Sequence, residues 1–167
     1  MTVAFLPGVD MGPNPWHLVS ETDPRALALV DGTHRLTEGP HYSRQNPASP
    51  TFTGNGASMV MVTGDGMAVW SVIHQRVVAS TEWRWRCNVF RRVGGGRASD
   101  LIRFATEATR IGLRRRYGAL PAVPLTTEVD PKKVRHKRDP GRCFIRAGWR
   151  VIGTTKSGLI RLEAPAE

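Results

Sequence analysis

The chain has 167 residues, of which 40% are hydrophobic, with 24 Lys and Arg against 14 Asp and Glu. This length fits a single domain that can bury a core without disulfides or metal ions. No run approaches the roughly 18 apolar residues that a membrane helix needs, and Met1 to Pro7 lacks the features of a secretion signal. We therefore expect a cytoplasmic protein that does not enter the membrane.

The net charge of +10 favours a polyanionic partner, above all nucleic acid. The same charge is equally typical of a plain soluble surface encoded by a GC-rich genome. The two cysteines, Cys87 and Cys143, form no Cys-x-x-Cys pair and have no matching set of histidines nearby. A disulfide framework or a zinc site is therefore not expected, and both cysteines are expected to be small buried residues.

Composition divides the chain into an irregular arm over residues 1–15, rich in Gly and Pro, and one folded domain over residues 16–167. Asp23 and Pro24 predict the start of a short helix that ends near Gly32. The stretch over residues 37–56 has no periodicity, and a loop of this length is either functional or disordered.

Hydrophobic periodicity predicts the remaining elements. Gly64-Asp65-Gly66 joins two apolar runs and predicts a β-hairpin. The longest helical period covers residues 98–117, and Gly118 follows it as a stop. Strands are predicted over residues 57–63, 67–74, 85–93, 123–129, 149–155 and 159–162, with another helix over 140–147. This order predicts an α/β or α+β domain with a central twisted mixed sheet flanked by helices.

The junction between the third strand and the long helix is a candidate anion site. Three glycines followed by Arg97 and Ser99 would let bare backbone amides and a helix N-terminus face a phosphate. The candidate cofactor-binding residues are Arg91, Arg92, Gly94, Gly95, Gly96, Arg97, Ala98 and Ser99. The pattern matches neither a Walker loop nor a dinucleotide fingerprint, and such glycine turns are as often purely structural.

This strand, glycine loop and helix resemble the cofactor-phosphate motif of GNAT acyltransferases. The segment Cys143-Phe144-Ile145-Arg146-Ala147-Gly148-Trp149 is similar to their late helix, which ends in Ala-Gly-aromatic. Further segments resemble the Mom family of DNA-modifying enzymes from Mu-like bacteriophages. They are Gly39-Pro40-His41-Tyr42-Ser43, Asn88-Val89-Phe90-Arg91, Ala98-Ser99-Asp100-Leu101-Ile102, Val129-Asp130-Pro131 and Asp139-Pro140-Gly141-Arg142-Cys143-Phe144.

The resemblance implies a GNAT-like fold and the transfer of a carbamoylmethyl or acyl-type group to the exocyclic N6 amine of adenine in DNA, which protects the DNA from restriction. It also implies that His41, Tyr42, Ser99 and Asp130 line the active site. Arg142 stands where the family pattern has an aromatic residue, and the triple glycine is unusual. The donor therefore stays open between an acyl-CoA-like molecule and another activated group donor.

The same residues have structural interpretations. Asp130 before Pro131 and Ser99 at a helix start are ordinary capping residues, and His41 and Tyr42 could simply pack their loop. His41 and Asp130 are only two candidate metal ligands, so no metal site is assigned and metal dependence stays open. We expect His74 to be solvated and Trp149 to lie in the core.

Basic residues near Asp130 predict a surface that binds DNA phosphates. The candidate DNA-binding residues are Lys132, Lys133, Arg135, Lys137, Arg138 and Arg142. A second basic group, Arg84, Arg86, Arg91 and Arg92, alternates with Trp83, Trp85 and Phe90. That pattern suits either nucleic-acid stacking or a strand with one buried aromatic face.

Three functions remain open from the sequence. The leading one is a DNA adenine-modifying transferase, which has double-stranded DNA and an activated group donor as partners and must flip the base, with Tyr42 or Trp149 as a stacking partner. The second is an N-acyltransferase that uses acyl-CoA on a small-molecule or protein amine. The third is a non-catalytic basic DNA-binding module. The oligomeric state stays open between a monomer and a homodimer.

Overall fold

The computed structural model describes residues 14–32, 51–53, 56–76, 82–118, 124–133 and 139–167. Most of the expected N-terminal arm and most of the loop over residues 37–56 lie outside these ranges. None of the helices in the described part is both long enough and apolar enough to cross a membrane.

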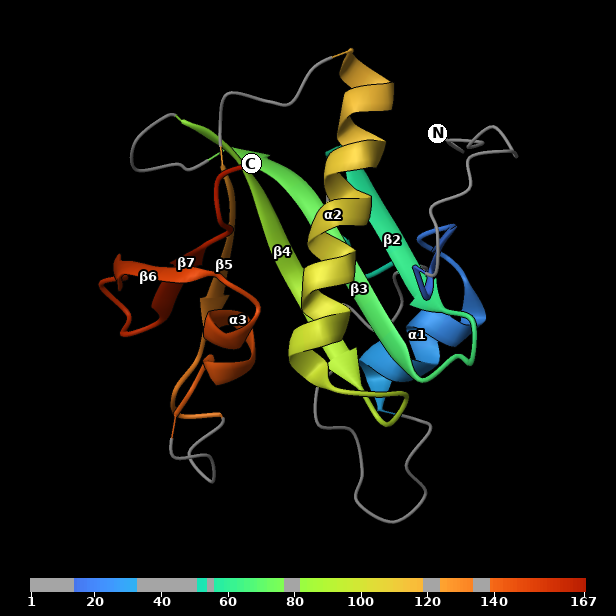
Figure 1. Ribbon diagram of the computed structural model, residues 1–167, viewed down its shortest axis with the longest axis horizontal. Coiled ribbons are helices and arrows are strands. Elements are labelled where there is room, and N and C mark those ends of the chain that lie inside the picture. The colour runs from blue at the N-terminus through green and yellow to red at the C-terminus, as the bar shows by residue number, and fades with distance from the viewer. Residues whose placement is uncertain (1–13, 33–50, 54–55, 77–81, 119–123, 134–138) are drawn as a thin grey trace.

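The described residues form one seven-stranded mixed sheet and three helices (Figure 1). The sheet order is β1-β2-β3-β4-β5-β7-β6, and only β4 and β5 are parallel. The strands are β1 Trp16–Val19, β2 Ser58–Thr63, β3 Ala68–Arg76, β4 Trp83–Arg92, β5 Leu125–Val129, β6 Arg150–Thr154 and β7 Ile160–Glu163. The helices are α1 Pro24–Asp31, α2 Ala98–Tyr117 and α3 Arg142–Arg146. The mixed α+β class predicted from the sequence is confirmed.

The differences from the sequence-based elements are local. β1 was not predicted, because its four residues, Trp-His-Leu-Val, are too few to show a period. α3 covers only residues 142–146 of the predicted 140–147, since Gly141 has a φ of 81° and stands as its N-cap. The hairpin, the helix α2 with its stop at Gly118, and the closing strand pair are confirmed.

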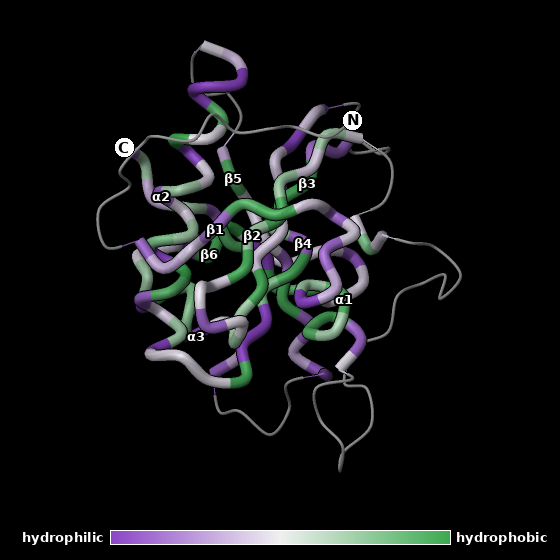
Figure 2. The backbone as a smooth tube through the Cα atoms, turned by 90° about the vertical axis from the view of Figure 1, so that its right-hand side faces the viewer, coloured by the Kyte–Doolittle hydropathy of each residue, from purple (hydrophilic) through white to green (hydrophobic). Residues whose placement is uncertain are grey.

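The helices cover both faces of the sheet, and Figure 2 shows the hydrophobic strands between α1 on one side and α2 and α3 on the other. Because successive side chains of a strand point to opposite faces of the sheet, the same strands contribute residues to the hydrophobic core on each face. On β3, Trp70 and Val72 pack on the α2 side, whereas Val69 packs on the α1 side. Two separate hydrophobic clusters therefore hold one sheet.

Three buried tryptophans hold α2 against the sheet. Trp70 donates its indole N–H to the Thr109 hydroxyl at 3.0 Å, and Trp149 donates to the Thr106 hydroxyl at 3.2 Å. Each threonine hydroxyl donates in turn to the carbonyl four residues earlier in α2, at 2.7 Å. Near the start of the helix, the Trp16 indole donates to the Leu101 carbonyl at 2.9 Å. The helix is therefore tied along its length by specific polar bonds inside an apolar layer.

The parallel pair β4 and β5 opens after a short contact. Only Trp85, Arg86 and Cys87 of β4 pair with residues of β5. The extra residue Asn88 forms a β-bulge, because Cys87 lies opposite Val72 while Val89 already lies opposite Ser71. From Asn88 to its end, β4 has no strand partner on its β5 side within the described part of the chain.

We predict that Trp70→Phe lowers the free energy of unfolding by about 2–4 kcal/mol, because it leaves a cavity and removes the donor to Thr109. Urea denaturation at 25 °C measures this change. The control is Phe104→Leu on the outer face of α2, where the side chain is 39% exposed and the expected change is within about 0.5 kcal/mol. Equal losses in the two variants would contradict a role for the buried indole bond.

Candidate functional site

Several sequence-predicted site residues lie at one edge of the sheet. Parallel neighbours end at the same edge, so the segments that follow β4 and β5 are brought to the same end of the molecule. α3 also starts there, because Gly141 lies against the side chains of Val129 and Leu162. We call the set of residues 94–99, Asp130, Lys132, Lys133 and Arg142 the edge site. Ligands in open sheets commonly bind beyond the carboxyl ends of parallel strands.

The glycine loop of the edge site is held from both ends. The Val93 amide donates to the Met67 carbonyl of the hairpin at 2.8 Å, and the Arg92 guanidinium donates to the Gly96 carbonyl at 2.6 Å. Gly95 and Gly96 have φ angles of 76° and 107°, which L side chains rarely adopt. The glycines are therefore required by the path of the backbone.

The loop leads into a helix N-terminus that no side chain caps. Arg97 is the N-cap of α2, and its side chain makes no capping hydrogen bond. Amides at the start of an uncapped helix point outward and, with the helix dipole, favour an anion. The interpretation of Ser99 as the cap is wrong, because the helix begins before it.

Ser99 lies in the first turn of α2 and is only 6% exposed. Within the described residues, no partner is recorded for its hydroxyl. A hydroxyl in this position can donate to an oxygen of a ligand bound at the helix start.

Asp65 approaches the glycine loop from the hairpin, which sequence reasoning missed. A Cβ atom added to Gly95 would lie 2.7 Å from Asp65 Oδ2. The other carboxylate oxygen accepts from the Thr63 hydroxyl at 2.6 Å and from the Met67 amide at 3.0 Å. The bond from Thr63, followed by the Met67 amide, lowers the pKa of Asp65. A negative charge therefore borders the hairpin side of the loop, and an anion has to approach from the α2 side.

Asp130 directly follows β5 and turns the chain. Its Oδ1 accepts from the Lys132 amide at 2.9 Å, and residues 131–133 form a turn. The helix-capping interpretation is therefore wrong. No hydrogen bond or ion pair joins Asp130 to Ser99 among the described residues, so the order of the strands alone places them at the same edge.

His41 and Tyr42 lie outside the described residues, as do Arg135, Lys137 and Arg138. The remaining predicted DNA-binding residues, Lys132, Lys133 and Arg142, are all exposed. Arg142 makes an ion pair with Asp139 at 3.3 Å. The edge site therefore carries basic side chains together with the carboxylates of Asp130 and, in the first turn of α2, Asp100.

The arginines of β4 are separated from its aromatic residues. Trp85 is buried on the α2 side, and Phe90 packs against the same cluster. Arg86 makes an ion pair with Glu128 at 3.2 Å, while Arg91 donates to the Val30 carbonyl of α1 at 3.3 Å. A buried aromatic face therefore explains why arginines and aromatic residues alternate in β4. Trp83 is the exception, because it is 50% exposed.

His74 is only partly exposed, whereas the sequence-based expectation was a solvated histidine. Its ring stacks on Trp83 with centroids 4.7 Å apart and on Trp85 at 4.8 Å. Burial between the two indoles lowers its pKa. Trp149, by contrast, lies in the core as expected, 2% exposed.

The cysteines have no role in the edge site. Cys87 is buried as expected and donates to the Val89 carbonyl, and burial raises the pKa of its thiol. Cys143 is only partly buried, because it lies on the short helix α3 at the rim of the core. Among the described residues, no group of three His, Cys, Asp or Glu side chains could hold a metal ion.

Comparisons with known proteins give no assignment. No protein-family model, curated protein or solved structure matches the chain. Any proposal of a function therefore rests on the chemistry of the edge site and on the resemblance of the sequence motifs to known families.

We predict that Gly95→Ala destabilises the protein by about 1–3 kcal/mol, because the new Cβ meets the fixed Asp65 carboxylate at a positive φ. Gly94→Ala is the matched control, since a Cβ there makes only ordinary contacts with Met67, at 3.7 Å or more. Thermal unfolding of the two variants measures the difference. Equal melting temperatures would contradict the close approach of Asp65.

We predict that stability falls between pH 7 and pH 5 in part through His74. Its pKa is lowered in the folded protein, so the unfolded chain, with a histidine pKa of about 6.5, takes up the proton first as the pH falls. His74→Phe keeps a stacking ring but cannot titrate, and should lose this part of the pH dependence. Urea denaturation at both pH values tests it, and an unchanged pH dependence in His74→Phe would contradict the assignment.

Proposed function

We propose that the chain is a GNAT-like transferase that modifies the exocyclic N6 amine of adenine in double-stranded DNA. One observation supports this most strongly. β4 and β5, the one parallel pair among the described strands, bring an uncapped helix start, Asp130 and two exposed lysines to the same edge of the sheet. An anion site, a candidate base and a cationic surface are what such a transfer requires.

The glycine loop and the start of α2 are proposed to hold the phosphates of the activated donor. The uncapped first turn supplies amide donors, and the exposed Arg97 adds positive charge. The unpaired part of β4 could bind an extended arm of an acyl-CoA-like donor through its backbone. In support, β4 has no strand partner on its β5 side from Asn88 onward within the described residues, and Asn88 Oδ1 is buried without a hydrogen-bond partner.

In the proposed reaction, the adenine N6 forms a bond to the carbon of the transferred group while the bond from that carbon to the donor's leaving group breaks. The N6 lone pair is delocalised into the ring, so its proton has to leave as the new bond forms. Asp130 is proposed to take that proton, since one carboxylate oxygen is engaged by the Lys132 amide and holds the group in place. Backbone amides at the α2 start and the Ser99 hydroxyl would stabilise developing negative charge on the donor.

The resemblance adds His41 and Tyr42 to this proposed active site. Lys132, Lys133 and Arg142 would position the DNA backbone without reading its sequence. The target base would have to leave the helix to reach the edge site, because its reacting atom is otherwise enclosed in the duplex.

Mass spectrometry of nucleosides from plasmid DNA tests the proposal in cells that express the wild-type chain or Asp130→Asn. Asparagine keeps the oxygen that accepts from the Lys132 amide but removes the base. We expect a new adenosine species in wild-type cells and its loss in Asp130→Asn. Its mass would identify the transferred group.

The matched control is Asp139→Asn, which removes an exposed carboxylate near the start of α3 and should keep the modification. Unmodified nucleosides from cells with well-expressed wild-type protein would contradict DNA modification. Tight binding of CoA in that case would favour an acyltransferase for small-molecule or protein amines. DNA binding alone would favour a non-catalytic module.

A further inference from the structure

A column of stacked rings lies at the end of the sheet opposite the edge site. We call Tyr117, Trp85, His74 and Trp83 the aromatic ladder. Tyr117 lies against Trp85 with centroids 6.0 Å apart, and Trp85, His74 and Trp83 follow at spacings of 4.8 and 4.7 Å. The interplanar angles on either side of His74 are 19° and 30°, so the last three rings are nearly parallel.

The two ends of the ladder differ in what lies over them. At one end Tyr117 is 49% exposed, and Arg116 lies over its ring, 5.4 Å from the centroid. At the other end, His74 covers one face of Trp83, yet the residue remains 50% exposed. The other four tryptophans are at most 5% exposed. Packing accounts for those four but not for an indole left in solvent at the end of a stack.

The surroundings of the ladder are basic. Arg76 lies opposite Trp83 in the β3–β4 register and is exposed. Arg115 and Arg116 are exposed at the C-terminal end of α2, beside Tyr117. The nearby carboxylate of Glu82 already pairs with Arg84 at 3.4 Å. A flat aromatic surface among arginines suits a nucleic-acid strand, whose bases stack and whose phosphates are anionic.

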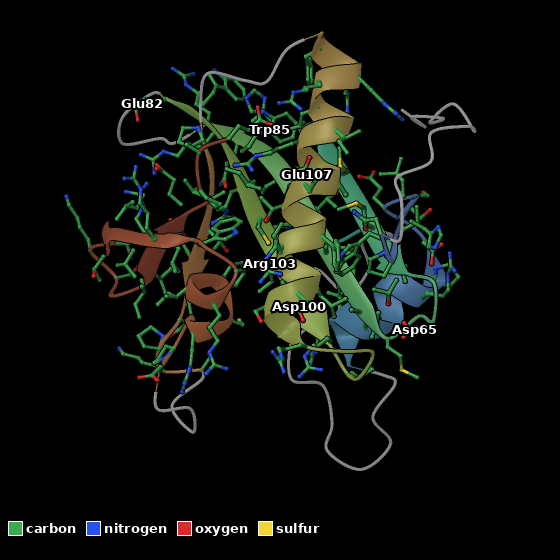
Figure 3. The ribbon with its side chains drawn as sticks, viewed as in Figure 1. Asp65, Glu82, Trp85, Asp100, Arg103 and Glu107 are labelled. Atoms are coloured by element: carbon green, nitrogen blue, oxygen red, sulfur yellow. The ribbon has the colours of Figure 1, made fainter. Side chains whose placement is uncertain are left out.

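We propose that the outer face of Trp83 is a stacking site for an unpaired base of a DNA strand, with Arg76 and the C-terminal arginines of α2 contacting its phosphates. This inference takes DNA as the partner from the proposed function but does not depend on catalysis. Figure 3 shows Trp85 and Asp100 near opposite ends of α2. A helix of 20 residues spans about 30 Å, which matches about nine steps along a DNA strand. A DNA strand that is unpaired near the ladder therefore has the length to reach both the ladder and the edge site.

Tryptophan fluorescence of the full chain provides a direct test, because Trp83 is the indole that a collisional quencher reaches most readily. The probe is a 12-residue oligodeoxyadenylate, which is slightly longer than the separation of about nine steps between the two sites, with deoxyadenosine monophosphate as the mononucleotide comparison. We expect the oligonucleotide to shield Trp83 from iodide and the mononucleotide not to do so at equal base concentration. Equal shielding by the mononucleotide would overturn a strand-binding site in favour of a nucleotide pocket.

The affinities of variants for the oligonucleotide distinguish base stacking from non-specific electrostatic attraction as the source of binding. Trp83→Leu should weaken binding about 5- to 150-fold, the range expected for one base stacked on an aromatic ring. Trp83→Phe should restore part of this loss, since it retains a ring. Phe104→Leu, which removes an exposed aromatic ring from the outer face of α2, is the matched control and should bind like the wild type.

Thermal unfolding verifies that each variant is folded before its affinity is compared. Wild-type affinity in a folded Trp83→Leu would overturn the inference. Adenine modification that persists in that case would show that the proposed function survives without the ladder. Conversely, a stacking loss in Trp83→Leu without any modified adenine in wild-type cells would keep the inference and refute the proposed function.

Discussion

The attachment of α2 to the sheet by buried indole N–H groups is the constraint on which the rest of the structure depends. Two threonine hydroxyls in the middle of α2 each donate within the helix and accept from a tryptophan of the sheet layer. A third indole holds the first part of the helix. Such bonds fix both the rotation and the axial position of the helix, because a buried donor that loses its acceptor is costly. Apolar packing alone would allow more sliding.

The position of α2 determines both ends of the molecule. At its start, the uncapped first turn lies beside the glycine loop, which the hairpin and Arg92 hold in place. At its end, Tyr117 lies against Trp85 of β4. The helix therefore connects a polar edge, suited to an anionic donor and an amine, with an aromatic and basic end, suited to a nucleic-acid strand. The two proposals therefore assign DNA contacts to opposite ends of this helix.

The opening between β4 and β5 is the second consequence of the fold. The strands pair over three residues and then diverge where Asn88 makes a bulge. The negative charge of Asp65 disfavours the approach of an anion from the hairpin side of the glycine loop.

Local sequence determined the elements that carry the edge site. The period of α2, its stop at Gly118, the hairpin glycines and the three-glycine loop were all predicted from spacing and residue type, because these signals depend on neighbours along the chain. Ser99 and Asp130 were proposed as site residues from short motifs, and that role stays a prediction. Only the tertiary structure decided which side chains meet across the sheet. The approach of Asp65 to Gly95, the stacking of His74 between two tryptophans and the pairing of the β4 arginines all join residues from different elements. Strand register and sheet order set those contacts, and no local pattern encodes them.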